Sequence, residues 1–153
     1  MAASLFLADP EATRALGSRL GALLRAGDLV LLTGELGAGK TTLAQGIAEG
    51  LDVRGPVTSP TFVIARVHPG LSGGPDLVHV DAYRLGGLEE LDALDLDASL
   101  EECVTVVEWG HGLAEGLAED HLEVFLEGVE HRTARLEAAG YRWAAVVEEL
   151  TAS

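Results

Sequence analysis

Apolar and polar positions in the first third of the chain follow two different periods. Residues 5–7 form a short apolar run, and residues 10 to about 25 place alanine and leucine at helical spacing behind Asp9 and Pro10, a pair typical of a helix start. Residues 29–33 form a continuous apolar run, as in a strand buried on both faces. The pattern therefore predicts a strand, a helix and a buried strand in that order.

The remainder of the chain continues this alternation and departs from it near its end. The further predicted elements are a helix over 40–49 that Gly50 ends, a β-rich segment over 61–67, strands over 77–80 and 104–107, one or two short acidic helices over 88–100, a weak helix over 111–119, an antiparallel strand pair over 121–126 and 132–137 around Gly128, and a helix over 141–150. Strands that alternate with helices indicate an α/β fold. We expect a mostly parallel central sheet with helices on both faces, an antiparallel C-terminal strand pair, and a single domain over 1–153.

Composition narrows the classes of function. The net charge of -15 repels phosphate backbones and the arginines form no basic stripe, so we expect no direct binding of DNA or RNA. An acidic surface either keeps the protein in solution or binds a basic partner protein. No apolar stretch approaches the ~20 residues of a membrane span, and no signal peptide is visible, so a cytoplasmic protein is expected. Cys103 lacks a neighbour at metal-ligand spacing and is predicted to be a small buried side chain.

A glycine-rich segment lies between the buried strand and the following helix. It matches G-x-x-x-x-G-K-[ST] and consists of Gly34, Glu35, Leu36, Gly37, Ala38, Gly39, Lys40 and Thr41, followed by Thr42. The glycines let successive N–H groups point at a phosphate, and the helix adds its positive end. Lys40, the only lysine of the chain, would reach the β- and γ-phosphates, Thr41 would ligate Mg²⁺, and Thr42 would touch the α-phosphate. The motif predicts a P-loop NTPase-type domain; the alternative is a glycine turn that binds nothing.

Two acidic residues follow apolar strands and are candidates for holding the metal of such a site. Asp81 follows the strand over 77–80, and Glu108 follows the strand over 104–107. The carboxyl ends of strands in an open α/β sheet line the ligand crevice, so both acids could face the phosphates. We expect Glu108 to anchor Mg²⁺ and Asp81 to orient the attacking water or join the metal shell. Alternatively, one of them only caps a loop.

Four further residues carry weaker signals. Thr61 lies where GTPases place a switch loop with a Mg²⁺-contacting threonine, although a Ser-Pro turn before a strand explains the segment equally well. Trp109 follows Glu108 and either shields the site or packs in the core. Arg84 could approach a phosphate or remain at the surface. His79 lies in the middle of a predicted strand and is interpreted as a core histidine.

Four motifs, taken in order, resemble the TsaE (YjeE) family. They are G-E-L-G-A-G-K-T-T at 34–42, T-S-P-T-F at 58–62, D-A-Y-R-L at 81–85 and V-E-W at 107–109. The P-loop alone is generic, whereas the ordered set is specific, and the likeness extends from the first helix to about Arg132. Gly110 departs from the family, since many members have proline there, and this concerns only the local loop shape.

The resemblance implies a small ATPase required for making threonylcarbamoyladenosine in tRNA. It implies ATP binding by the P-loop, Mg²⁺ at Thr41 and Glu108, and roles in hydrolysis for Asp81 and Trp109, with Thr61 as the switch-like threonine. It also implies an arginine near the nucleotide at Arg132 and an adenine contact around Pro10 and Glu11. Such proteins bind a TsaB–TsaD heterodimer, hydrolyse ATP to drive or reset it, and reach tRNA only indirectly.

Two rival functions remain open at this point. A small-molecule or nucleoside kinase is disfavoured because no arginine-rich lid is visible to enclose a second anionic substrate. A nucleotide-gated binding module with negligible turnover is the other rival. The G-specific N/T-K-x-D motif is absent, which favours ATP over GTP.

Overall fold

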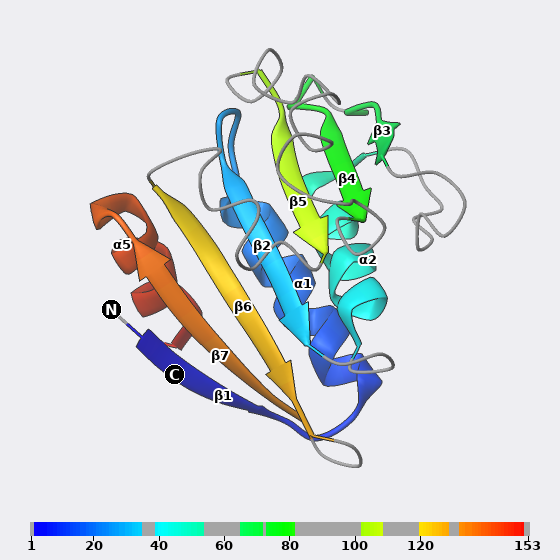
Figure 1. Cartoon of the computed structure of the whole chain (residues 1–153). Coiled ribbons are helices and arrows are strands. Elements are labelled where there is room, and N and C mark those ends of the chain that lie inside the picture. Colours follow the sequence, from blue (N-terminus) through cyan, green and yellow to red (C-terminus); the bar gives the residue numbers. More distant parts are fainter. Residues whose placement is uncertain are drawn as a thin grey trace.

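The structure is a computed structural model that describes residues 2–34, 39–53, 65–71, 73–81, 102–108, 120–128 and 132–151. Its elements, in chain order, are β1 (Ala2–Leu7), α1 (Pro10–Leu23), β2 (Leu29–Gly34), α2 (Lys40–Leu51), β3 (Ala65–His68), β4 (Leu77–Asp81), β5 (Val104–Glu108), β6 (His121–Glu127), β7 (Arg132–Ala139) and α5 (Tyr141–Thr151) (Figure 1). The helices predicted over 88–100 and 111–119 lie outside the described residues.

All seven of these strands form one sheet in the order β1-β7-β6-β2-β5-β4-β3. The four central strands, β6, β2, β5 and β4, are parallel to one another. β7 is antiparallel to both β6 and β1, and β3 is antiparallel to β4. The α/β fold with a mostly parallel centre and an antiparallel C-terminal strand pair is therefore confirmed. β1 is longer than its predicted span of 5–7 because it pairs with β7 along its whole length.

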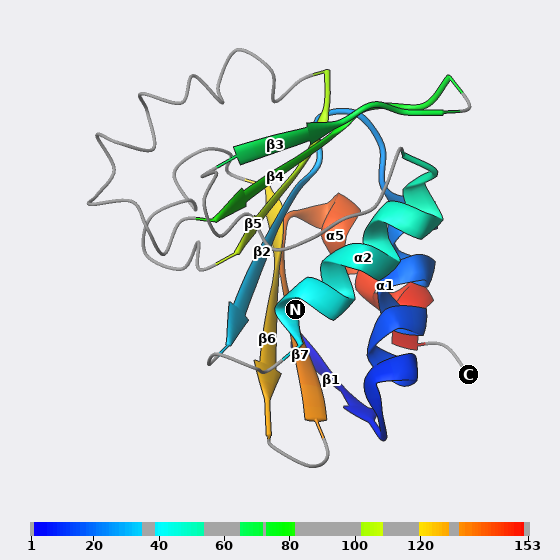
Figure 2. The ribbon, with the colours of Figure 1, turned by 90° about the vertical axis from the view of Figure 1, so that its right-hand side faces the viewer.

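The three helices of the described residues lie on one face of the sheet (Figure 2). The side chains of Val30, Leu32, Val104 and Val106 join that helix-covered core. Leu29 and Leu31 alternate with them along β2 and are also buried, which confirms a central strand shielded on both faces.

Helix α1 begins as predicted. Asp9 is its N-cap, with an Oδ1 that accepts a hydrogen bond of 2.8 Å from the backbone N–H of Ala12, and Pro10 occupies the first helical turn. The predicted end of α2 at Gly50 is wrong. The helix runs on to Leu51, and Asp52 follows it in the left-handed region at a φ of 61°.

Gly50 lies inside α2 because α1 and α2 cross there with their backbones in contact. A Cβ built on Gly50 would lie 2.0 Å from the carbonyl oxygen of Ser18, and one on Gly46 would lie 2.2 Å from that of Arg14. The contact is mutual, since a Cβ on Gly17 or Gly21 of α1 would lie 2.4 or 2.2 Å from carbonyl oxygens of α2. Two pairs of glycines at four-residue spacing thus let the two backbones approach where any side chain would collide.

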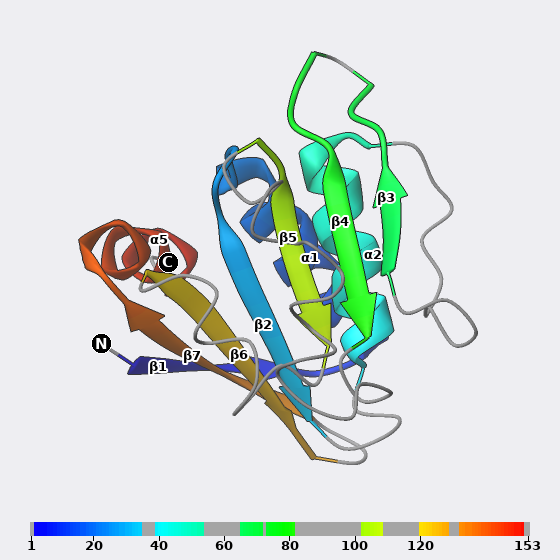
Figure 3. The same cartoon turned by 45° about the horizontal axis from the view of Figure 1, so that its top comes forward.

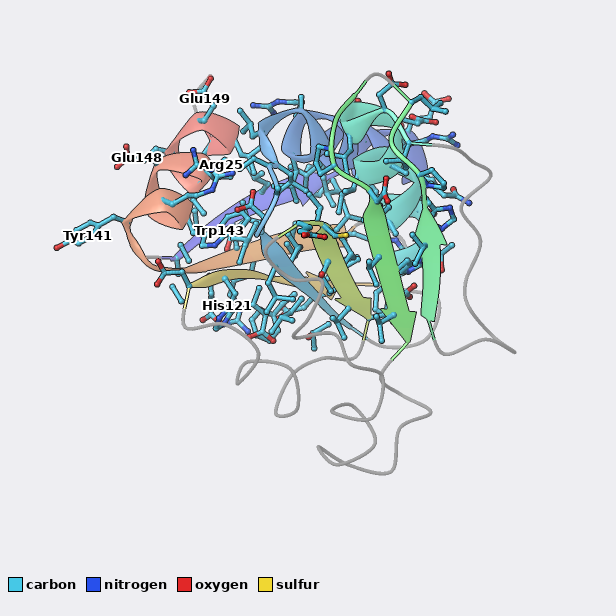
Figure 4. All side chains as sticks on the ribbon, turned by 90° about the horizontal axis from the view of Figure 1, so that it is seen from above. Arg25, His121, Tyr141, Trp143, Glu148 and Glu149 are labelled. Atoms are coloured by element: carbon cyan, nitrogen blue, oxygen red, sulfur yellow. The ribbon has the colours of Figure 1, made fainter. Side chains whose placement is uncertain are left out.

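Helix α5 closes the same face over the antiparallel strands. Its Trp143 is buried in the core, whereas Tyr141 points into solvent (Figure 4). Arg142 ties the helix to the start of β2, because its Nε donates a 2.9 Å hydrogen bond to Oδ1 of Asp28. The same guanidinium donates to the carbonyl of Leu23 at the end of α1. The bond to Asp28 raises the pKa of Arg142 and joins the last helix to the first α/β unit.

Replacing Gly17 by alanine is expected to lower the free energy of unfolding by about 1–3 kcal/mol, because the new Cβ would collide with backbone atoms that cannot rotate away. This loss should appear even though alanine favours an isolated helix by about 1 kcal/mol. Urea unfolding followed by circular dichroism measures it. The matched control is Gly74→Ala, where a Cβ meets open space and the change should stay within about 0.5 kcal/mol. A Gly17→Ala variant as stable as the parent would contradict the close crossing.

Candidate nucleotide-phosphate site

The central parallel strands β2, β5 and β4 end at the same edge of the sheet (Figure 3). The backbone register pairs Glu108 with Leu32 of β2 on one side and with Asp81 of β4 on the other. These three positions therefore form one row across adjacent strands. Gly34 ends β2 two residues beyond this row. Asp81 and Glu108 are thus adjacent in the backbone register at the ends of neighbouring parallel strands.

Lys40 is held in place by the strand that precedes it. Its Nζ donates a 2.8 Å hydrogen bond to the carbonyl oxygen of Gly34, and the residue is only 5% exposed. A buried ammonium requires polar partners, and a phosphate supplies them with the opposite charge. The bond to Gly34 keeps the ammonium at the end of β2.

The first turn of α2 offers backbone N–H groups at the same place. Its N-cap is Gly39, with a φ of +102°, which has no side chain to bond these donors. No acidic residue lies in this turn. The helix start thus presents its positive end, which suits an anion.

Two further elements approach Gly39 from distant parts of the chain. A Cβ built on Gly39 would lie 3.7 Å from Cδ and Nε of Arg132, the first residue of β7, and 3.7 Å from Cγ2 of Thr13 in α1. The structure therefore places the predicted C-terminal arginine against the P-loop motif, although 92 residues separate Arg132 from Lys40 by their numbers. Lys40 and Arg132 supply local positive charge within a chain of net charge -15.

Glu108 is buried at the end of β5 and has a histidine partner. Nε2 of His79 lies 2.5 Å from Oε2 of Glu108, across the pair β4 and β5. Glu108 is 4% exposed and His79 is fully buried. The carboxylate thus has one oxygen occupied by the imidazole.

The remaining predicted residues divide by their place in the structure. Thr41 and Thr42 occupy the first turn of α2 and are half-buried. Pro10 and Glu11 are exposed at the start of α1, the helix that brings Thr13 to Gly39. The predictions for Glu35, Leu36, Gly37, Ala38, Thr61, Arg84 and Trp109 lie outside the described residues, as does the side chain of Asp81.

Two residues that sequence reasoning did not assign belong to this region. Thr13 is buried, and among the described residues its hydroxyl has no hydrogen-bond partner. Its signal in the sequence was a threonine on the apolar side of an alanine- and leucine-rich helix. His79 was interpreted as a core histidine without a named partner, and the structure adds that this partner is Glu108.

The donor set fits a magnesium ion better than a softer metal. A buried carboxylate at Glu108 and a hydroxyl at Thr41 are hard oxygen ligands, which Mg²⁺ combines with phosphate oxygens and water. Within the described ranges, no cluster of three or more His, Cys, Asp or Glu side chains could hold a metal ion. The described helices also include none that is long and apolar enough to cross a membrane.

Comparisons with known proteins agree with this arrangement. A statistical model of the family "Threonylcarbamoyl adenosine biosynthesis protein TsaE" matches residues 7–136. The chain is 61% identical over 138 residues to the "tRNA threonylcarbamoyladenosine biosynthesis protein TsaE" of Streptomyces coelicolor, covering 86% of this chain and 93% of the relative. It is 36% identical over 146 residues to the protein of that name from Bacillus subtilis, covering 94% and 90%. The solved Bacillus structure titled YdiB superposes with a TM-score of 0.77 at 31% identity, covering 99% of this chain and 95% of the other.

The fold and the motif define the class of protein first: an α/β domain whose P-loop sequence motif joins a central parallel strand to a helix. Within that class, the chain belongs to the TsaE family, which takes part in the biosynthesis of threonylcarbamoyladenosine in tRNA. The family resemblance read from four sequence motifs is therefore confirmed. None of these comparisons supports the kinase alternative.

The single cysteine lies at the opposite end of β5 from Glu108, and it should be chemically quiet. Burial, followed by the charges of Asp76 and Glu102, raises the pKa of the Cys103 thiol. A raised pKa leaves less thiolate at neutral pH, so alkylation by iodoacetamide at pH 7.5 should be several-fold slower in the folded protein than in urea. The two rates should converge only as the pH rises above the range of an ordinary thiol. Cys103 is half-buried, so the expectation of a fully buried side chain is wrong. Equal rates at pH 7.5 would contradict a partly shielded, inert cysteine.

Proposed function

We propose that this chain is an ATPase that binds ATP with Mg²⁺ at the P-loop edge and hydrolyses it to drive or reset a TsaB–TsaD heterodimer. The observation that carries the proposal is the convergence on Gly39 and Lys40. The uncapped start of α2, whose first residue is the buried Lys40, meets the guanidinium of Arg132 from the distant strand β7. Such a set of donors suits a polyphosphate.

Each proposed role follows from the position of the residue. Lys40 would exchange its bond to the carbonyl of Gly34 for the β- and γ-phosphates, a short movement of a flexible side chain. Arg132 would offer its guanidinium from the β7 side of Gly39. Pro10 and Glu11, at the start of α1, would lie toward the adenine.

The two acids at the ends of β5 and β4, Glu108 and Asp81, would serve the metal. Glu108 and Thr41 would hold Mg²⁺, and Asp81, beside Glu108 in the register, would orient the attacking water. Bound magnesium would neutralise charge on the β- and γ-phosphate oxygens during transfer to water. Thr61 and Trp109, which follow α2 and β5 in the sequence, would complete the site.

The charge of the molecule supports action through partner proteins. A chain of net charge -15 repels the tRNA backbone, and its relatives are named as tRNA threonylcarbamoyladenosine biosynthesis proteins. We therefore place the chain in the cytoplasm, with contact to tRNA only through the heterodimer. Hydrolysis would be slow in isolation.

Replacing Lys40 by alanine tests the site itself. Loss of a charge-assisted bond of about 1.5–3 kcal/mol should weaken ATP and ADP binding roughly 10- to 100-fold, as measured by calorimetry with Mg²⁺. Arg14→Ala is the matched control, because it also removes one positive charge, from an exposed arginine of α1 that pairs with Glu49. Its affinity should stay within about twofold of the parent. Equal affinities in all three proteins would contradict phosphate binding by the motif.

Phosphate release tests the function. We expect a low rate with the chain alone and a rate at least tenfold higher when purified TsaB and TsaD are added together. The Lys40→Ala variant should show no stimulation. Transfer of the γ-phosphate to a nucleoside or another small acceptor would instead support the kinase alternative, and tight binding without release would support a nucleotide-gated module.

A further inference from the structure

His79 is a polar residue in the middle of a buried strand, and its environment is unusual. Every residue of β4 for which burial is described is buried, and His79 has no exposed surface. The side chain partner that the structure gives it is Glu108 of β5, at 2.5 Å between Nε2 and Oε2. A strand of this kind would normally carry valine or isoleucine, so the polar group needs an explanation.

The register explains how the two side chains meet. His79 pairs with Val106, and Asp81 pairs with Glu108, so His79 lies two residues behind Glu108 on the same face of the sheet. The imidazole therefore approaches the carboxylate from the neighbouring strand and bonds one of its two oxygens. Oε2 is the occupied oxygen.

The environment of Nδ1 indicates that Nε2 is the ring nitrogen that carries the hydrogen and donates it to Glu108. Within the described part of the chain, Nδ1 of His79 is buried without a hydrogen-bond partner. A neutral ring with its hydrogen on Nε2 donates to Glu108 and leaves only an unpaired acceptor at Nδ1. The other tautomer would set a lone pair against the carboxylate and bury an unpaired N–H.

We propose that His79 is a positioning residue, which holds the carboxylate of Glu108 so that its free oxygen faces a metal ion at the crevice. The inference rests on the proposed function, since it assigns an orientation to the metal ligand of that site. A glutamate has three side-chain torsions, and a fixed hydrogen bond removes the cost of ordering them when the metal binds. A purely structural histidine would affect folding but not the metal dependence of nucleotide binding.

The wild-type protein itself provides the first test. ¹⁵N-resolved NMR of the imidazole should show the Nε2–H tautomer for His79. This tautomer should persist in Thr105→Val, which removes a buried polar group from the neighbouring strand without touching the pair. A resonance pattern of the Nδ1–H tautomer would overturn the proposal, whether or not any variant folds.

The second test separates positioning from folding. ADP affinity is measured by calorimetry over a series of Mg²⁺ concentrations and again in EDTA. His79→Leu should lower the apparent Mg²⁺ affinity roughly 10- to 100-fold, the size expected for loss of a residue that orients a ligand. Its ADP affinity in EDTA should stay within about twofold. His79→Gln, whose amide can donate near the position of Nε2, should recover most of the loss.

A thermodynamic cycle shows whether His79 acts through Glu108. In a Glu108→Gln background, adding His79→Leu should cause no further loss of Mg²⁺ affinity. Equal loss in both backgrounds, or equal loss with and without Mg²⁺, would overturn the positioning role.

Failure of this inference can be told from failure of the proposed function. If the wild type binds ADP with Mg²⁺ and His79→Leu keeps its Mg²⁺ affinity, only the positioning role is overturned. If the wild type shows no Mg²⁺-dependent ADP binding, the proposed function is overturned and the positioning role with it.

Discussion

The architecture depends on the contact between α1 and α2, in which two helix backbones touch through glycine. Gly17 and Gly21 face Gly46 and Gly50 so closely that a single methyl group on any of them would lie within 2.4 Å of a carbonyl oxygen. Close packing of this kind leaves the helices no freedom to slide, because every displacement brings side chains into the crossing. The first α/β unit is therefore held at one geometry.

That geometry determines what surrounds the P-loop motif. Because α1 and α2 run side by side from their first turns, Thr13 lies against Gly39 at the start of α2. The pairing of β7 with β1 and β6 brings Arg132 to the same glycine. The antiparallel strands at the end of the chain thus do more than extend the sheet, since they deliver a cation to a site whose motif lies near the beginning.

The other side of the site depends on strand register. One residue of slippage between β4 and β5 would turn Glu108 or His79 to the opposite face and separate them. The valines on both faces of these strands are buried, so slippage would force two packed faces to rearrange at once. A polar pair of this kind is retained in a core only with its partners in place, because an unpaired buried carboxylate is costly. Packing of the apolar strands thus keeps Glu108 beside Asp81 in the backbone register.

The sequence by itself determined the α/β class, the position of most elements, the phosphate motif at residues 34–41, and the two acids at strand ends, because these depend on local periodicity and on residue types at short spacing. It misplaced the end of α2 at Gly50, because a glycine that ends a helix and one that permits a close crossing look alike without the neighbouring helix. Only the tertiary structure decided the strand order, the place of Arg132 beside Gly39, and the bond between His79 and Glu108. These features join residues far apart in the chain, and the register and packing that bring them together leave no mark in the local pattern.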